Sequence, residues 1–204
     1  MKITKFLNSL QSIPSTPTLE NQYLDPNKVK NLEIYLREAI QHKHSLFVGE
    51  AAGYLGMAQT GIGFTSPYQL DGNTHFFLDG IVDKMIVQKL YGKGENSARY
   101  FWESMTANNI VPVAWNACPF HPHKTGDMAT NGKPTKQQIA IGKNYLLDLL
   151  DLISPQEIVS IGSFAYELLN DCGIPHKHAR HPSYGGSNIF KENIDEIFGN
   201  KDKE

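Results

Sequence analysis

Residues 48–66 read VGEAAGYLGMAQTGIGFTS and place five of the chain's 17 glycines around a single acid, Glu50. The apolar run SLFVG at 45–49 leads into this stretch and is typical of a strand buried in a parallel sheet. Glycines let a backbone turn tightly and approach a ligand closely. The stretch has neither the Gly-Lys-Ser/Thr ending of a phosphate loop nor a Gly-x-Gly-x-x-Gly fingerprint. It therefore predicts a strand that ends in a ligand-binding loop, but not one of those nucleotide-binding types.

Strands and helices are expected to alternate on both sides of this loop. Asp25 and Pro26 are typical of a helix start, as Thr135 is of a later one, and Gly173 is typical of a helix end. Hydrophobic spacing predicts strands at 45–49, 110–115, 157–161 and 176–180, and helices at 25–41, 79–90, 97–107, 136–153, 162–172 and 187–198. This alternation predicts an α/β fold, a mostly parallel four-stranded sheet with helices on both faces.

Composition predicts one ordinary globular domain. The chain has 204 residues, of which 40% are hydrophobic and 20% charged. We expect a single domain over 1–204, with a loose N-terminal segment at 1–24 and a frayed tail at 199–204. No apolar run reaches the roughly 18 residues of a membrane span, and the N-terminus lacks the features of a signal peptide. The expectation is a soluble, cytoplasmic protein with no membrane partner.

Charge and cysteine content exclude some classes of site. A net charge of −2 gives no general attraction to a polyanion, so it neither supports nor excludes nucleic acid as a partner. The two cysteines, Cys118 and Cys172, lie far apart and have no partner pattern. They argue against a disulfide scaffold, a cysteine-rich zinc site and a four-cysteine iron–sulfur cluster. We expect two reduced thiols.

Three loops are expected to meet at one edge of the sheet. They begin at Glu50, Asn116 and His181, each at or just after the end of a predicted strand. In open α/β sheets, ligands bind in the crevice beyond the carboxyl ends of the strands. The second loop, 116–134, is also longer than a simple connection requires. The sequence therefore predicts a binding cleft lined by these three loops.

Four motifs follow one another over about residues 45–198: GEAAGYLG…TGIGFTS, WNACPFHPH, IVSIGSFAYELL and RHPSYGG. Together they resemble the uracil-DNA glycosylase superfamily, most closely its branch with Gly-Glu-Ala-Pro-Gly and His-Pro-Ser motifs. The resemblance implies a three-layer α/β/α sandwich that flips uracil out of DNA and hydrolyses its N-glycosidic bond, as in base excision repair. We expect a monomer that needs no cofactor or metal and that acts on DNA containing uracil or another deaminated base.

The resemblance also assigns roles to residues of the cleft. Glu50 matches the acid that positions a water and stabilises the sugar cation, and His181 matches the histidine that donates to uracil O2. Phe64 matches the aromatic that stacks on the base, and Asn116 matches the amide that pairs with uracil O4 and N3–H. Gly49 and Ala51 flank the acid in the first motif and are expected to contact the base.

A loop after the last strand resembles the element that holds the flipped state by entering the duplex. It contains Pro182, Ser183, Tyr184 and Gly185, and Arg180 precedes it. The resemblance implies DNA contacts for all five residues, with Arg180 and Ser183 as phosphate partners.

The chain also departs from the family pattern. Ala52 stands where the first motif usually has proline, and Gly63 stands where a proline often precedes the stacking aromatic. Gly53 occupies the position of a tyrosine that blocks the methyl group of thymine in the best-known branch. The sequence leaves open whether Tyr54, one residue later, takes over that role. The cluster-binding cysteines of the nearest branch are missing, so a cluster-free relative is expected.

Each predicted site residue also has an ordinary structural interpretation. Glu50 can cap backbone amides, Phe64 can belong to the core, Asn116 can stabilise a turn, and His181 can be a surface residue. Imidazole pairs suggest a second alternative, a metal-dependent hydrolase. Its candidate ligands are His42, His44, His121, His123, Asp127, His176 and His178.

Two further alternatives keep the family but change the activity. A non-catalytic relative that binds DNA or a free nucleobase is one, although the retained acid Glu50 favours catalysis. A glycosylase for hypoxanthine or xanthine is the other, because the shape of the pocket selects the base. No lysine stands at the acid position to form a Schiff base, so strand cleavage is not predicted.

Overall fold

The computed structural model describes residues 2–72, 74–86 and 94–199 and is built around one four-stranded parallel sheet. Its strand order is β3-β2-β5-β6. The strands are β2 (His44–Ala51), β3 (Val111–Cys118), β5 (Ile158–Ile161) and β6 (Lys177–Ala179). All three strand pairs are parallel, as the alternating pattern predicts.

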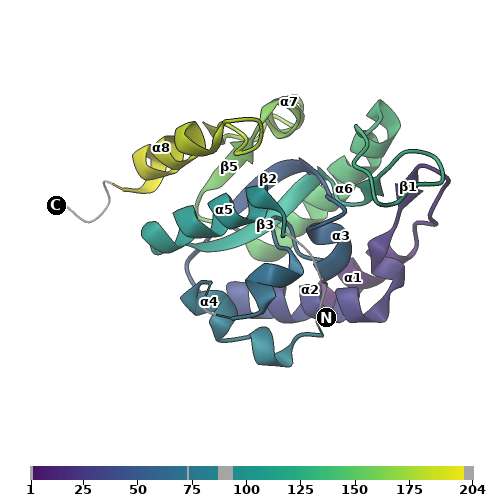
Figure 1. The fold of residues 1–204 in the computed structure, drawn as a ribbon, viewed down its shortest axis with the longest axis horizontal. Coiled ribbons are helices and arrows are strands. Elements are labelled where there is room, and N and C mark those ends of the chain that lie inside the picture. Colours follow the sequence, from purple (N-terminus) through teal and green to yellow (C-terminus); the bar gives the residue numbers. More distant parts are fainter. Residues whose placement is uncertain (1, 73, 87–93, 200–204) are drawn as a thin grey trace.

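Helices cover both faces of this sheet (Figure 1). The larger ones are α2 (Pro26–Ala39), α5 (Asn96–Ala107), α6 (Lys136–Ile153), α7 (Ser163–Asp171) and α8 (Ser187–Phe198). In the sheet, β3 lies on one side of β2, and β5 and β6 lie on the other side. The connection from β2 to β3 therefore runs in the opposite direction to the connections from β3 to β5 and from β5 to β6. Right-handed crossovers therefore place α5 opposite α6 and α7, and α8 packs against α5. The predicted three-layer α/β/α sandwich is confirmed.

Shorter elements complete the described chain. They are α1 (Lys2–Gln11), β1 (Leu19–Glu20), η1 (Gln22–Leu24), α3 (Met57–Thr60), η2 (Pro67–Leu70), α4 (Phe76–Asp79), η3 (Val82–Lys84) and β4 (His121–Pro122), where η marks a 3-10 helix. Strands β1 and β4 form a separate antiparallel pair. None of the described helices has the length and apolar character needed to cross a membrane.

The predicted helix starts depend on local side-chain caps. The Asp25 carboxylate accepts a hydrogen bond from the Asn27 amide at 2.9 Å, and Pro26 takes the first helical position of α2. Thr135 accepts from the Gln138 amide at 3.3 Å, and the Gln138 side chain accepts from the Thr135 amide at 2.8 Å. This reciprocal capping box fixes the start of α6.

The prediction of a loose segment at 1–24 is wrong for the described residues 2–24. The first helix, α1, buries Phe6 and Leu10, and the Phe6 ring lies 5.7 Å from the Trp115 ring. The Asn21 side chain donates to the Leu10 carbonyl at 2.8 Å and stabilises the turn that follows α1. The helix forms because its apolar face packs against α2 and α6 and meets Trp115 of β3, contacts that its own sequence does not reveal. The predicted frayed tail falls mostly on 200–204, outside the described residues.

The helix expected at 79–90 is replaced by two short pieces, α4 and η3, as far as the chain is described there. Residues 87–90 of that prediction lie outside the described residues. At its last described position, the Ile86 amide donates to Asn31 Oδ1 at 2.8 Å and its carbonyl accepts from Asn31 Nδ2 at 2.9 Å. The Asn31 side chain from α2 thus satisfies backbone groups that a helix would otherwise pair.

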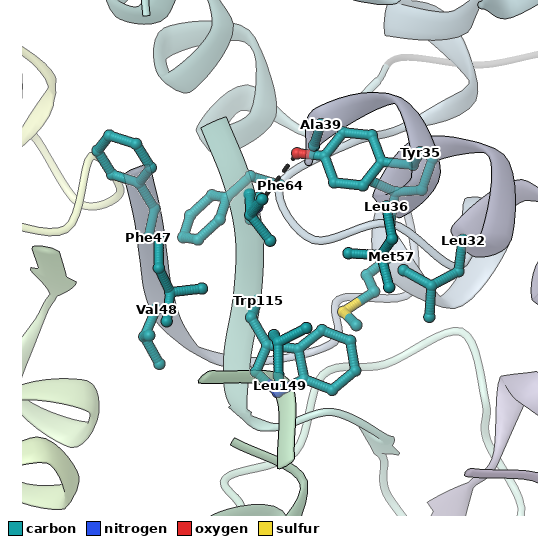
Figure 2. Packing of buried hydrophobic residues seen from close by; sticks show 14 of the residues in the cluster. Leu32, Tyr35, Leu36, Ala39, Phe47, Val48, Met57, Phe64, Trp115 and Leu149 are labelled. Atoms are coloured by element: carbon teal, nitrogen blue, oxygen red, sulfur yellow. Dashed lines mark hydrogen bonds between the residues drawn. The ribbon is translucent and has the colours of Figure 1, made fainter. Parts of the chain in front are cut away.

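One buried hydrophobic cluster joins the sheet to both helical layers. Figure 2 shows part of it, with Trp115 of β3 beside Leu149 of α6, and Phe47 of β2 on the side of Phe64. The Phe47 ring also meets the Phe101 ring of α5 at 5.4 Å. Because the core is closed on both faces, the open end of the sheet at the strands' carboxyl ends is the place left for a site.

Gly142→Ala is expected to destabilise the fold by about 3 kcal/mol, the upper part of the usual overpacking range. A Cβ at this position of α6 would overlap the carbonyl oxygen of Ala117 in β3, so helix and strand would have to separate. Urea denaturation of the variant measures the loss. Asn144→Ala, at an exposed position of the same helix, is the matched control and should change stability by less than about 0.5 kcal/mol. Equal stabilities for the two variants would contradict the close packing of α6 on β3.

Candidate active site

The three predicted loops meet at one end of the sheet. Parallel pairing of β2 with β3 sets Gly49 opposite Asn116, and His181 follows β6 by two residues. An inner cavity of about 20 Å³ lies where they meet. It is lined by Glu50, Ala51, Gly53, Met57, Phe64, Glu95, Asn116 and His181. The predicted convergence of loops is therefore confirmed, while the chemical roles of the residues stay predictions.

A wider cleft of about 420 Å³ opens beside the inner cavity. Glu50, Ala51, Gly53, Glu95 and His181 line both spaces. The cleft is further lined by Ala52, Asn96, Ser97, Asn131, Gly132, Lys133, Ser183 and Tyr184. A ligand that enters through the cleft reaches the inner cavity between the two carboxylates and the imidazole.

Glu50 is the residue before the last of β2 and is half-buried. Within the described part of the chain, its carboxylate accepts no hydrogen bond, so the amide-capping interpretation finds no support there. Burial raises the pKa of the Glu50 carboxyl above its ordinary value, and the charge of Lys133 offsets part of that rise. Its oxygens remain available to a water or a ligand in the cleft.

Phe64 forms an aromatic wall of the inner cavity. Its ring stacks on Phe101 at 4.9 Å, and its backbone has a left-handed φ of 47°. The preceding Gly63 is required because a Cβ there would lie 2.6 Å from the carbonyl oxygen of Ala114. The same contact excludes the proline that the family pattern often has at this position. The loop is fixed by close packing on β3 rather than by a proline ring.

Asn116 belongs to β3, which runs on to Cys118, so the expected loop 116–134 begins later than predicted. Pairing of Ala51 with Cys118 extends the strand. The Asn116 side chain is buried, and its Nδ2 donates to Met57 Sδ at 3.0 Å. A Cβ at Gly49 would lie 2.5 Å from Asn116 Oδ1 and 2.6 Å from the Phe64 ring. Gly49 thus brings the amide and the aromatic wall together.

His181 is held as a neutral imidazole with a defined tautomer. The Ser183 amide donates to Nδ1 at 3.2 Å, and a backbone N–H can only donate, so Nδ1 is the acceptor and Nε2 carries the proton. The Ser183 hydroxyl lies 2.7 Å from the same nitrogen. Burial lowers the pKa of His181 to about 4, with a further contribution from the charge of Arg180. At neutral pH the ring is an uncharged donor.

The loop after β6 projects one aromatic side chain from the rim of the cleft. Tyr184 is 99% exposed and has a left-handed φ of 51°, followed by Gly185 at 76°. Pro182 is buried, and Ser183 holds His181, so these two residues support the loop rather than extend from it. Arg180 is exposed and donates to the His181 carbonyl at 3.2 Å.

Sequence reasoning missed Glu95, the second acid of the cavity. It precedes α5 and lies directly after a glycine, in a stretch interpreted only as a break between helices. Burial raises the pKa of the Glu95 carboxyl, and a hydrogen bond from Ser97 opposes that rise. The sequence did carry a signal for this residue, because Glu95, like Glu50, is an acid that directly follows a glycine. Tyr54 lines neither of the two spaces, as far as the described residues define them.

The histidines proposed as metal ligands make other contacts. His121 Nδ1 lies 2.7 Å from the Ala52 carbonyl, and its Nε2 lies 3.0 Å from the Met128 carbonyl. His123 Nδ1 faces the Lys124 carbonyl at 2.9 Å. Across the described ranges, no three His, Cys, Asp or Glu side chains are grouped as a metal site. The buried His121 instead ties the glycine loop to the loop after β3.

Comparison with known proteins supports the fold. No family model matches the sequence, and no curated protein does. The crystal structure of wild-type Pedobacter heparinus SMUG2 is similar, with a TM-score of 0.68 and 15% sequence identity. The match covers 97% of this chain and 95% of that one. This match confirms the α/β/α fold that the sequence resemblance implies.

Proposed function

We propose that the protein is a DNA glycosylase that hydrolyses the N-glycosidic bond of a flipped-out uracil. The observation that carries this proposal is the meeting of Glu50, Phe64, Asn116 and His181 around one cavity at the carboxyl ends of the strands. The fold shared with SMUG2 supports the class of enzyme. Uracil as the base rests on the sequence resemblance and on the chemistry below.

Glu50 acts on the sugar side of the bond. As the bond breaks, positive charge develops on the deoxyribose, and a nearby carboxylate stabilises it. The same carboxylate accepts a proton from the attacking water, for which its oxygens are free within the described structure. Ionised Glu50 is thus both the electrostatic partner of the cation and the general base.

Asn116 and Phe64 hold the base. A side-chain amide offers one donor and one acceptor, which complement O4 and N3–H of uracil and mismatch the reversed pattern of cytosine. The donor Nδ2 is now directed at Met57 Sδ, a weak acceptor, so a carbonyl oxygen can replace the sulfur at little cost. The inner cavity of about 20 Å³ must widen to admit a base, and movement of Met57 is the simplest way.

His181 acts on the leaving base. Negative charge collects on uracil O2 as the bond breaks, and Nε2–H is the free donor of the ring. A neutral donor suits this step, because it stabilises the developing anion without first needing a proton from solution. The low pKa of His181 keeps it neutral through the physiological range.

Tyr184→Ala is expected to reduce activity on double-stranded DNA at least tenfold more than on single-stranded DNA. Extruding a base from a duplex costs a few kcal/mol of stacking, and the fully exposed ring at the rim of the cleft is placed to fill the gap. The ratio of kcat/KM on matched double- and single-stranded uracil substrates measures the effect. Tyr166→Ala, an exposed tyrosine of α7, is the control. An unchanged ratio for Tyr184→Ala would remove this residue from the flipping step.

The experiment that tests the function is a base-release assay on the purified protein. Oligonucleotides carry uracil, hypoxanthine or xanthine, single-stranded and double-stranded, and abasic sites are measured after alkaline cleavage. Release of uracil is expected, without strand cleavage before the alkali. Release of hypoxanthine or xanthine but not uracil would show that the substrate is a deaminated purine. Binding without release of any base would contradict the enzyme and favour a nucleobase-binding protein.

A further inference from the structure

We propose that Glu95 closes the base pocket opposite carbon 5 of the pyrimidine and is the residue that rejects thymine. This inference rests on the proposed function, since it concerns the specificity of the same cavity. It assigns a role to a side chain of the helical layer that faces the glycine loop.

The carboxylate of Glu95 is fixed in the wall of the cavity. Ser97 Oγ donates to its Oε1 at 2.6 Å, which ties the carboxylate to the first turn of α5. The carboxylate also lies against the glycine loop. A Cβ at Gly56 would overlap Oε2, and a Cβ at Gly53 would lie 3.1 Å from Oε1. The acid occupies the volume that side chains at 53 and 56 would otherwise fill.

This packing explains why the loop lacks side chains at both positions. Gly56 has no Cβ because Glu95 takes its place, and the same holds with a looser fit at Gly53. The backbone of the glycine loop therefore prevents the Glu95 carboxylate from moving toward residues 53 and 56, while Ser97 holds its Oε1. A ligand atom that presses on Glu95 must therefore break a hydrogen bond or displace the loop backbone.

We place Glu95 by asking which atoms of the uracil ring have no partner among the other polar residues of the cavity. Asn116 takes O4 and N3–H, His181 takes O2, and Glu50 faces the sugar at N1. Among the residues that line the inner cavity, Glu95 is the remaining polar side chain. Carbons 5 and 6 are the ring positions left between O4 and N1. Carbon 5 is the one that carries the methyl group of thymine, and we place it against the wall that Glu95 and Gly53 form.

A hydrogen at carbon 5 fits against this wall, whereas a methyl group does not. Thymine differs from uracil only by that methyl, which would press an apolar group on a carboxyl already bonded to Ser97. One methyl in a shaped pocket changes kcat/KM by about 10- to 200-fold. Tyr54 does not line the cavity in the described structure, whereas the fixed carboxylate of Glu95 does, so we assign the discrimination to Glu95.

The test compares uracil with thymine, each placed opposite guanine in the same double-stranded oligonucleotide. Glu95→Ala is expected to raise the thymine-to-uracil ratio of kcat/KM at least tenfold while uracil is still released. Glu95→Gln keeps the size and the acceptor for Ser97, so it should keep the wild-type ratio. Glu103→Ala, at an exposed acid of α5, is the matched control and should also leave the ratio unchanged.

Glu95→Asp provides a second variant if the alanine protein does not fold. Its carboxyl is one methylene shorter and withdraws from the base, so a smaller rise in the thymine-to-uracil ratio is expected. Wild-type uracil release with no rise in either folded variant would overturn the inference and leave the proposed function intact. Failure of the wild-type protein to release any pyrimidine would overturn both.

Discussion

Glu50→Gln is expected to lower kcat for uracil release by about 100- to 10,000-fold, the usual contribution of a general base. Glutamine keeps the shape of the side chain but removes both the charge that faces the sugar cation and the proton acceptor for water. KM should change little, because the loss falls on the transition state and not on the bound substrate. Single-turnover kinetics on a uracil oligonucleotide separate the chemical step from product release.

The pH profile provides a second readout for Glu50. Burial raises the pKa of this carboxyl, so the acid limb of kcat should lie above the usual glutamate pKa of about 4.3. Above its pKa Glu50 is ionised and active, and activity is lost as the pH falls through that value. Burial lowers the pKa of His181 and raises that of Glu50, so Glu50 is the first of the two to take up a proton as the pH falls. The limb should be missing in Glu50→Gln.

Glu103→Gln is the matched control for Glu50, because this acid is exposed on α5 and pairs only loosely with Arg99, at 4.0 Å. It should retain wild-type kcat and the acid limb. Wild-type activity in Glu50→Gln, or an acid limb that persists in that variant, would contradict the assignment of the base.

His181→Ala is expected to lower kcat by about 100- to 1,000-fold, the cost of removing one donor to a developing oxyanion. The reason is geometric, since Ser183 fixes the ring through Nδ1 and leaves Nε2–H for the leaving base. Abasic-site formation under saturating substrate measures the effect. Restoring a side-chain N–H donor with His181→Gln should recover part of the loss.

His178→Ala is the matched control for His181. His178 lies three residues earlier on β6, is exposed, and its Nδ1 contacts the Ser160 hydroxyl at 2.9 Å. Its removal should leave kcat within about twofold of the wild type. Comparable losses in His178→Ala and His181→Ala would point to a structural effect of this edge of the sheet rather than to a donor at the base.

Sequence reasoning predicted the elements best where local chemistry decides them. The caps at Asp25 and Thr135 depend on side chains that lie next to one another in the chain. The reasoning failed at α1 and at 79–90, where distant partners decide the conformation. Trp115 gives α1 a surface to pack on, and Asn31 takes the backbone groups of Ile86.

For this protein, the sequence by itself determined the strand and helix order, and therefore which loops reach the carboxyl ends of the strands. That follows because hydrophobic periodicity and parallel-sheet topology are readable along the chain. Only the tertiary structure decided that Glu95 joins the cavity and that His181 is neutral with its proton on Nε2. Burial and side-chain contact depend on segments that meet in space, and the spacing of residues along the chain does not encode those distances.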